Sequence, residues 1–115
     1  MALQYNLSKV YEISENDIDF AYQIVNLFLE EVPAEIKSMK VGIEEKDFTR
    51  VYTSAHKIKP SLDLLGMDLA YDENIEIMSW AKSQGKRKEI KDTYKSLRER
   101  INLAIKELKK DFKLA

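Results

Sequence analysis

Hydrophobic residues recur every three or four positions along most of the chain, the spacing that places side chains on one face of an α-helix. The first run predicts a helix that begins near Ser14, which can cap it with Asp17 as a weaker capping-box partner. We expect Pro33 to end or kink this helix and to open a second one, which stops near Glu45 and Lys46. The apolar positions of the two segments are Ile18, Ala21, Ile24, Val25, Phe28, Val32, Ile36, Met39 and Ile43.

The third predicted helix carries the only histidine of the chain, His56. The helix opens at Asp47 or Thr49, and Gly66 sits where a left-handed C-terminal cap belongs. Its apolar stripe consists of Phe48, Val51, Ala55, Ile58, Leu62 and Leu65. Because successive helical residues turn by about 100°, His56 lies roughly 140° from the centre of this stripe. We therefore expect its imidazole to face solvent.

Two more helices are expected after Gly66, separated by a polar turn at residues 83–88. Asp68 can cap the fourth helix, whose predicted apolar face is Tyr71, Ile75, Met78 and Ala81, with Trp80 nearby. The fifth helix has near-heptad apolar positions at Ile90, Tyr94, Leu97, Ile101, Ala104, Ile105, Leu108 and Phe112. No run alternates convincingly, so no strand is predicted. The pattern favours an all-α fold: an antiparallel up-down four-helix bundle with an additional N-terminal helix or helix extension.

The composition is typical of a single soluble globular domain and does not indicate a function. With 115 residues, 44% hydrophobic and 34% charged, the chain fits one globular domain spanning residues 1–115. The absence of cysteine excludes disulfides and thiolate metal sites. The N-terminus lacks the basic and apolar regions of a signal peptide, and no window has the length and hydropathy of a membrane span. We expect a soluble, cytoplasmic protein.

The charge pattern gives no support for nucleic-acid binding or membrane insertion. Net charge is -1, whereas nucleic-acid modules usually carry a basic excess. Two basic stretches, residues 85–88 and 109–113, are interspersed with acidic residues nearby. We interpret both stretches as part of a mixed, solvated helix face.

His56 lies beside two lysines, and this arrangement suits phosphate chemistry. Lys59 follows one helical turn later and can share an anion with the imidazole, while Lys57 points about 100° around the helix. Nearby positive charges favour the neutral imidazole, whose free nitrogen is a nucleophile. Lysine is a common point-charge partner of phosphate. The ordinary alternative is a surface histidine with unrelated lysines nearby.

The stretch AHKIKPSLDLLGM, residues 55–67, resembles the active-site helix of histidine-containing phosphotransfer (HPt) domains. That family shows an alanine-histidine pair, a hydrophobic-lysine pair, a small residue and a leucine-glycine pair. In this chain the matching residues are Ala55, His56, Ile58, Lys59, Ser61, Leu65 and Gly66. FLEEVP, residues 28–33, and EEKDF, residues 44–48, are also similar to the segments that lead into the family's histidine helix. The resemblance covers residues 14–110, about the whole domain core.

The resemblance implies a phosphorelay intermediate of two-component signal transduction. His56 would accept a phosphoryl group from a receiver-domain aspartate and pass it to another receiver, with Lys59 offsetting the phosphate charge. The implied partners are response-regulator receiver domains and a hybrid sensor histidine kinase. Such a protein is not an enzyme: it needs no cofactor or metal of its own, and Mg²⁺ belongs to the receiver. The sequence contains no glycine-rich phosphate-binding loop, which agrees with this expectation. We expect a monomer.

Two positions depart from the family pattern. Pro60 stands where many members have glycine, and it cannot donate a hydrogen bond to the carbonyl of His56. We expect a slight kink or widening of the helix at this turn. Met78 aligns with a polar residue that orients the imidazole in some members, so Asn74 or Lys82 could take that role instead.

The remaining neighbours of His56 have weaker assignments. Tyr52, one turn before His56, could belong to an apolar docking patch, although partial core burial is the simpler interpretation. Asp63 could pair with Lys59 at helical spacing. Two rival functions remain: an HPt-like adaptor that has lost phosphotransfer, and a dimerising fragment of a histidine kinase. Lys57 stands where the kinase fragment usually has an acidic residue, which disfavours the second rival.

Overall fold

The computed structural model describes residues 5–113, and over this range the chain forms five α-helices and no strand. The helices are α1 (Ser8–Ser14), α2 (Ile18–Glu45), α3 (Phe48–Leu64), α4 (Asp68–Ser83) and α5 (Arg87–Asp111). The expected all-α class is confirmed. Within residues 5–113, no helix combines the length and the hydropathy needed to cross a membrane.

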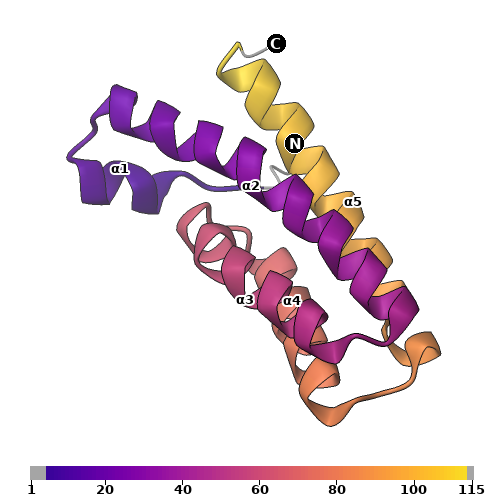
Figure 1. Cartoon of the computed structure of the whole chain (residues 1–115). Helices are drawn as coiled ribbons and strands as arrows, with labels where there is room; N and C mark the ends of the chain where they lie inside the picture. Colours follow the sequence, from indigo (N-terminus) through magenta and orange to yellow (C-terminus); the bar gives the residue numbers. More distant parts are fainter. Residues whose placement is uncertain (1–4, 114–115) are drawn as a thin grey trace.

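The helices pack as neighbours along the chain, and α5 returns to the first long helix. α2 packs against α3, α3 against α4 and α4 against α5, while α5 also contacts α2 and α1 lies on α2. Figure 1 shows α2 and α5 side by side over much of their length. The molecule is elongated, with extents of 43 × 23 × 23 Å. One hydrophobic core runs between the helices and includes Val10 of α1.

α2 is one continuous helix of 28 residues, so the expected helix end at Pro33 is wrong, while a kink there stays a prediction. Pro33 lacks the N–H that would bond to the carbonyl of Leu29, which costs stability in a helix interior. The apolar face nevertheless continues in register on both sides, with Val32 and Ile36 both buried. Burial of this long face offsets the missing hydrogen bond, because helical stability in proteins comes mainly from packing.

The start of α2 also differs from the prediction. Ser14 is the last residue of α1, a short helix that the hydropathy pattern did not reveal because Val10 is its only buried residue. Asp17 is the true N-cap of α2, and its carboxylate accepts hydrogen bonds from the backbone N–H groups of Asp19 and Phe20 at 2.9 and 3.3 Å. The additional helix is therefore not the one that the sequence predicted: the predicted first and second helices are both parts of α2, and α1 is an unpredicted addition before them.

The ends of α3 follow the prediction closely. The carboxylate of Asp47 accepts a hydrogen bond from the backbone N–H of Arg50 at 3.1 Å, and the chain leaves the helix through Gly66 at φ 63°. A Cβ on Gly66 would lie 2.7 Å from the carbonyl oxygen of Asn6, so both the backbone angle and the close approach require glycine.

The predicted apolar face of α4 is confirmed at Met78 and Ala81, only in part at Tyr71, and wrong at Ile75. Ile75 is exposed and Tyr71 only half-buried, whereas the buried residues are Ala70, Asn74, Ile77, Met78, Trp80 and Ala81. A hydropathy pattern does not point to Asn74, a polar residue, as part of the buried face. Asp68 is the first helical residue and caps nothing with its side chain.

Candidate functional site around His56

His56 lies near the middle of α3 and is exposed, as the helical spacing predicted. The residues that anchor α3 on the opposite side, Val51, Ala55, Ile58 and Leu62, are at most 1% exposed. Their burial fixes the rotation of the helix and therefore the outward direction of the imidazole. No side chain among residues 5–113 makes a hydrogen bond with the imidazole, which leaves both ring nitrogens available.

The ring of Tyr52 stacks on the imidazole from the preceding helical turn. The two ring centroids are 6.0 Å apart and the ring planes differ by 19°. Tyr52 is half-buried and also packs against the core, so its own position is well fixed. The tyrosine ring restricts the imidazole on one side and gives the site an apolar edge.

The two lysines near His56 differ in their surroundings. Lys57 lies 3.7 Å from a carboxylate oxygen of Glu35 on α2, which draws it away from the histidine side of α3. Lys59 has no ion-pairing carboxylate among the described residues, and its side chain is half-buried. Lys59 is therefore the cation that can respond to a new negative charge on His56.

Asp63 does not pair with Lys59, so that expectation is wrong. Its carboxylate lies 3.1 Å from the ammonium of Lys9 on α1, in a pair whose side chains are both more than half exposed. The spacing between Lys59 and Asp63 fits a helical pair, but α1 brings a competing cation to the same carboxylate. Exposed pairs of this kind contribute little to stability, about 0 to 1 kcal/mol.

Pro60 lies inside α3 without ending it, because the helix continues to Leu64. The proline has no N–H, so the carbonyl of His56 lacks its usual helical donor. Pro60 is exposed beside the histidine and adds no long side chain there. The kink that the sequence suggests at this turn stays a prediction.

Asn74 does not orient the imidazole. It is completely buried, and its side-chain amide nitrogen donates to the carbonyl oxygen of Ala55 at 2.8 Å. This bond ties α4 to α3 at the residue that precedes His56. Its own carbonyl oxygen, Oδ1, is buried and has no hydrogen-bond partner within the described part of the chain.

The other two candidates on α4 lie near α3 without bonding to the histidine. Met78 is buried in the core, 8% exposed, and supplies no polar group. Lys82 is exposed and lines a shallow hollow together with Tyr52 and Phe48 of α3. The polar imidazole orienter of some HPt domains therefore has no counterpart among residues 5–113.

The sequence interpretation missed a second charged feature, on α5. The side chains of Arg87, Lys91 and Arg98 line one groove beside α2, although the sequence suggested a mixed solvated face. Their spacing of four and seven residues places them on one face of a helix, and this spacing was the available clue.

Comparison of the chain with protein-family models, with curated proteins and with solved structures found no match. Function must therefore be inferred from the site itself. The site combines an exposed imidazole on a rigid helix, a stacked tyrosine ring and a lysine one turn away with no carboxylate partner among residues 5–113.

Proposed function

We propose that this chain is an HPt-type phosphorelay protein in which His56 carries the phosphoryl group. In this proposal α2, α3, α4 and α5 form the antiparallel four-helix bundle of that family, with α1 as an addition. The observation that carries the proposal is the pair of an exposed His56 and a Lys59 that lacks a carboxylate partner among residues 5–113. The similarity of residues 55–67 to the family's histidine helix supports it.

The proposed reaction is an exchange between a carboxylate and an imidazole. The lone pair of His56 Nε2 attacks the phosphorus of an aspartyl phosphate in line, and a P–N bond forms while the P–O bond to the aspartate breaks. The aspartate leaves as a carboxylate. Lys59 offsets the negative charge that arrives on the imidazole. The reverse attack by another aspartate returns the phosphoryl group to oxygen.

The proposed partners follow from this chemistry. A receiver domain of a response regulator supplies the aspartyl phosphate together with its own Mg²⁺, and a hybrid sensor histidine kinase feeds the relay. The chain contributes a nucleophile and a docking surface, and it acts as a monomeric cytoplasmic phosphocarrier, not as an enzyme. Tyr52 presents an apolar edge next to His56, which suits a modest, transient interface.

Incubation with a ³²P-labelled, phosphorylated receiver domain tests the proposal. We expect label on the chain that is stable in alkali and labile in acid, the behaviour of phosphohistidine, and we expect none on His56→Gln. If a panel of receivers transfers no label while one of them still binds, the chain is an HPt-like adaptor and the phosphotransfer proposal is wrong.

Two matched lysine variants test the role of Lys59. Lys59→Ala removes the cation without a carboxylate partner in the described chain, whereas Lys57→Ala removes one that already lies near Glu35. A charge-assisted contact is worth about 1.5 to 3 kcal/mol, so we expect Lys59→Ala to slow transfer roughly tenfold or more. Lys57→Ala should change the rate much less. If both variants slow transfer equally, Lys59 is not the residue that offsets the phosphate charge.

A further inference from the structure

α2 and α5 enclose a long groove that contains no residue of the proposed phosphotransfer site. One cavity of about 570 Å³ lies between the C-terminal part of α2 and the N-terminal half of α5. A second cavity of about 490 Å³ continues it toward Pro33 and Asn102. The two cavities share Lys40, Glu44, Tyr94 and Arg98, so they form one continuous groove along the outside of the helix pair.

The residues around this groove are predominantly positively charged. The first cavity is lined by six of the 19 basic residues of the chain and by one of its 20 acidic residues, Glu44. The six cations are Lys40, Arg87, Lys88, Lys91, Lys95 and Arg98. None of the six takes part in a carboxylate ion pair within residues 5–113. A chain of net charge -1 thus concentrates unpaired positive charge on one face.

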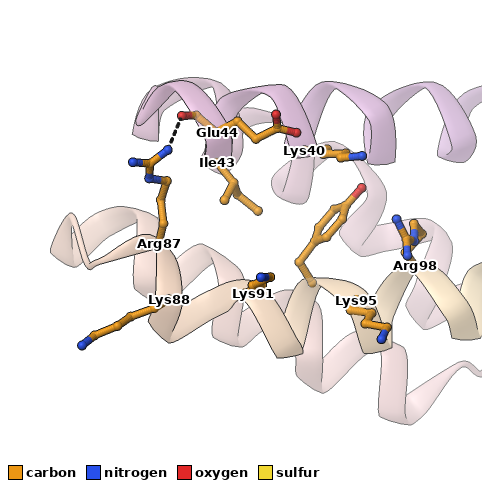
Figure 2. Close-up of a pocket in the computed structure, with 9 residues that line it drawn as sticks. Lys40, Ile43, Glu44, Arg87, Lys88, Lys91, Lys95 and Arg98 are labelled. Carbon is orange, nitrogen blue, oxygen red and sulfur yellow. Dashed lines mark hydrogen bonds between the residues drawn. The ribbon is translucent and has the colours of Figure 1, made fainter.

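The acidic residues of α4 explain how this segregation arises. Thr93 and Arg100 bond to the carboxylates of Glu76 and Glu73, so the α4 side of α5 meets negative charge. The opposite side of α5, which faces the groove, carries the cations. Figure 2 shows Arg87 reaching the end of α2, where it donates to the carbonyl oxygen of Glu44 at 3.1 Å. Lys88 and Lys95 extend away from α2 in the same view.

The floor of the groove is apolar and firmly held. Ile43 points from α2 toward α5 in Figure 2 and is 8% exposed. Tyr94 lines the same cavity, and its hydroxyl donates to the carbonyl oxygen of Ile36 at 3.0 Å. Val41, 36% exposed, adds an apolar group at the rim of the second cavity. The groove therefore offers an apolar base between cationic walls.

We propose that this groove binds an acidic amphipathic helix of a partner protein. From Arg87 to Asn102 the groove spans about 22 Å at 1.5 Å per residue, the length of a helical segment of roughly 15 residues. Helices bind such grooves through apolar residues on one face, and acidic residues on the flanks complement the cationic walls.

The shape of the groove disfavours other anionic ligands. A single phosphate-sized anion needs donors that converge on one point, but five of these cations are spread over about the first three turns of α5 and the sixth, Lys40, is on α2. A lipid surface needs apolar groups that protrude, whereas Ile43 and Tyr94 lie at the base of a concave groove, each 8% exposed. A helix uses the length, the base and the walls together.

The proposed helix would bind apart from His56. The groove is lined by α2 and α5, whereas His56 is on α3, which packs against α2 and α4. A bound helix would therefore leave the imidazole accessible. The inference does not depend on phosphotransfer, because it rests only on the shape and charge of the groove.

The probe is a stapled, fluorescein-labelled helix of about 18 residues, long enough to cover the groove at 1.5 Å per residue. It carries leucine along one face and glutamate elsewhere, and binding is followed by fluorescence anisotropy. We expect salt-sensitive binding that Lys40→Glu/Lys91→Glu weakens at least about tenfold, because a like charge across an interface is costly. The matched control Lys106→Glu/Lys110→Glu changes the same charge on exposed residues of α5 outside the groove lining. It should bind nearly as the unmodified chain does.

The other outcomes overturn the proposal. A peptide with glutamine in place of leucine should not bind, and equal binding would mean that charge alone acts. Preferential binding of duplex DNA or of phosphatidylglycerol vesicles, lost in Lys40→Glu/Lys91→Glu, would assign the groove to a different class of ligand. A dimer in light scattering that the same variant abolishes would assign it to a second copy. Absence of peptide binding to a chain with unchanged circular dichroism would exclude the acidic helix.

Discussion

Asn74 is an unusual side chain of the core, because it is a fully buried polar group whose hydrogen bonds are only partly satisfied. Its Nδ2 donates to the carbonyl oxygen of Ala55, while its Oδ1 has no partner within residues 5–113. A buried polar atom without a partner costs free energy, so packing around this side chain must compensate. Asn74 holds α4 against the turn of α3 that carries His56, and we infer that it positions this turn.

Substitution of Asn74 should therefore affect both stability and the histidine. We expect Asn74→Ala to lower the free energy of unfolding by about 1 to 3 kcal/mol, because a buried hydrogen bond is lost and a cavity forms. We also expect a shift of the His56 imidazole resonances in NMR spectra. Urea denaturation measures the first effect. Ser79→Ala, on the exposed side of α4, should change neither quantity. Unchanged imidazole resonances in Asn74→Ala would remove the positioning role.

Tyr94 makes stability depend on pH at the alkaline end. Burial raises the pKa of its hydroxyl above the ordinary value of 10.0, and this effect outweighs the opposing influence of Arg98. Above pH 10 the unfolded chain loses the phenolic proton while the folded chain keeps it. The unfolded state then binds fewer protons, so the free energy of unfolding falls as pH rises.

We expect this fall to be less steep in Tyr94→Phe, by at most about 1.4 kcal/mol per pH unit for one group. Below pH 9 the difference in stability between the two proteins should stay constant, because both states keep the proton. Urea denaturation at a series of pH values gives the slopes. Parallel curves above pH 10 would contradict the role of Tyr94. Tyr5, whose pKa is raised by burial and by its hydrogen bond to Asp111, adds to the fall in both proteins.

Local sequence patterns predicted the orientation and backbone angle of some residues but not which partners the charged and buried polar residues find. The outward direction of His56 and the left-handed Gly66 depend only on helical spacing and on one backbone angle, and both were predicted correctly. The pairs Lys57–Glu35 and Lys9–Asp63 depend on which helix lies opposite, which no local pattern contains. The burial of Asn74 likewise depends on the carbonyl that α3 presents to it.

At the scale of the element, the two prolines show how packing overrides local preference. Pro33 lies inside α2 and Pro60 inside α3, and both helices continue through them. A proline in a helix interior costs about 3 kcal/mol relative to alanine. The sequence predicted a boundary at Pro33 because this cost is local, whereas the compensating burial of the flanking apolar residues belongs to the assembled fold.

The two prolines also give a matched pair of variants. We expect Pro33→Ala and Pro60→Ala each to raise the free energy of unfolding by about 1 to 3 kcal/mol, because each restores a helical N–H. Only Pro60→Ala returns a donor to the carbonyl of His56, so only this variant should change the rate of phosphotransfer. Urea denaturation and transfer from a labelled receiver measure the two effects. Equal transfer rates in both variants would mean that Pro60 does not influence the histidine.

At the scale of the whole molecule, the N-terminal segment ties the turn between α3 and α4 to the C-terminal end of α5. The backbone N–H of Asn6 donates to the carbonyl oxygen of Leu65 at 2.7 Å, at the turn between α3 and α4. The hydroxyl of Tyr5 donates to a carboxylate oxygen of Asp111 at the end of α5. This segment lies before the first strong apolar period, so no hydropathy pattern predicted its contacts. Its hydrogen bonds involve neither the face that bears His56 nor the groove between α2 and α5.

These two faces should act independently, because they share no residue. We expect His56→Gln, which removes the phosphoryl acceptor, to bind the acidic helical peptide with unchanged affinity. We expect Lys40→Glu/Lys91→Glu, which reverses charge in the groove, to accept a phosphoryl group at an unchanged rate. Anisotropy with the peptide and transfer from a labelled receiver, both measured on both variants, give the complete comparison.

If peptide binding alters the transfer rate of the unmodified chain, α2 couples the faces, since it lines the groove and packs against α3. If this coupling acts on binding, a phosphoryl group on His56 would in turn change the affinity for the peptide by the corresponding factor. Independent faces require that neither the transfer rate nor the peptide affinity changes.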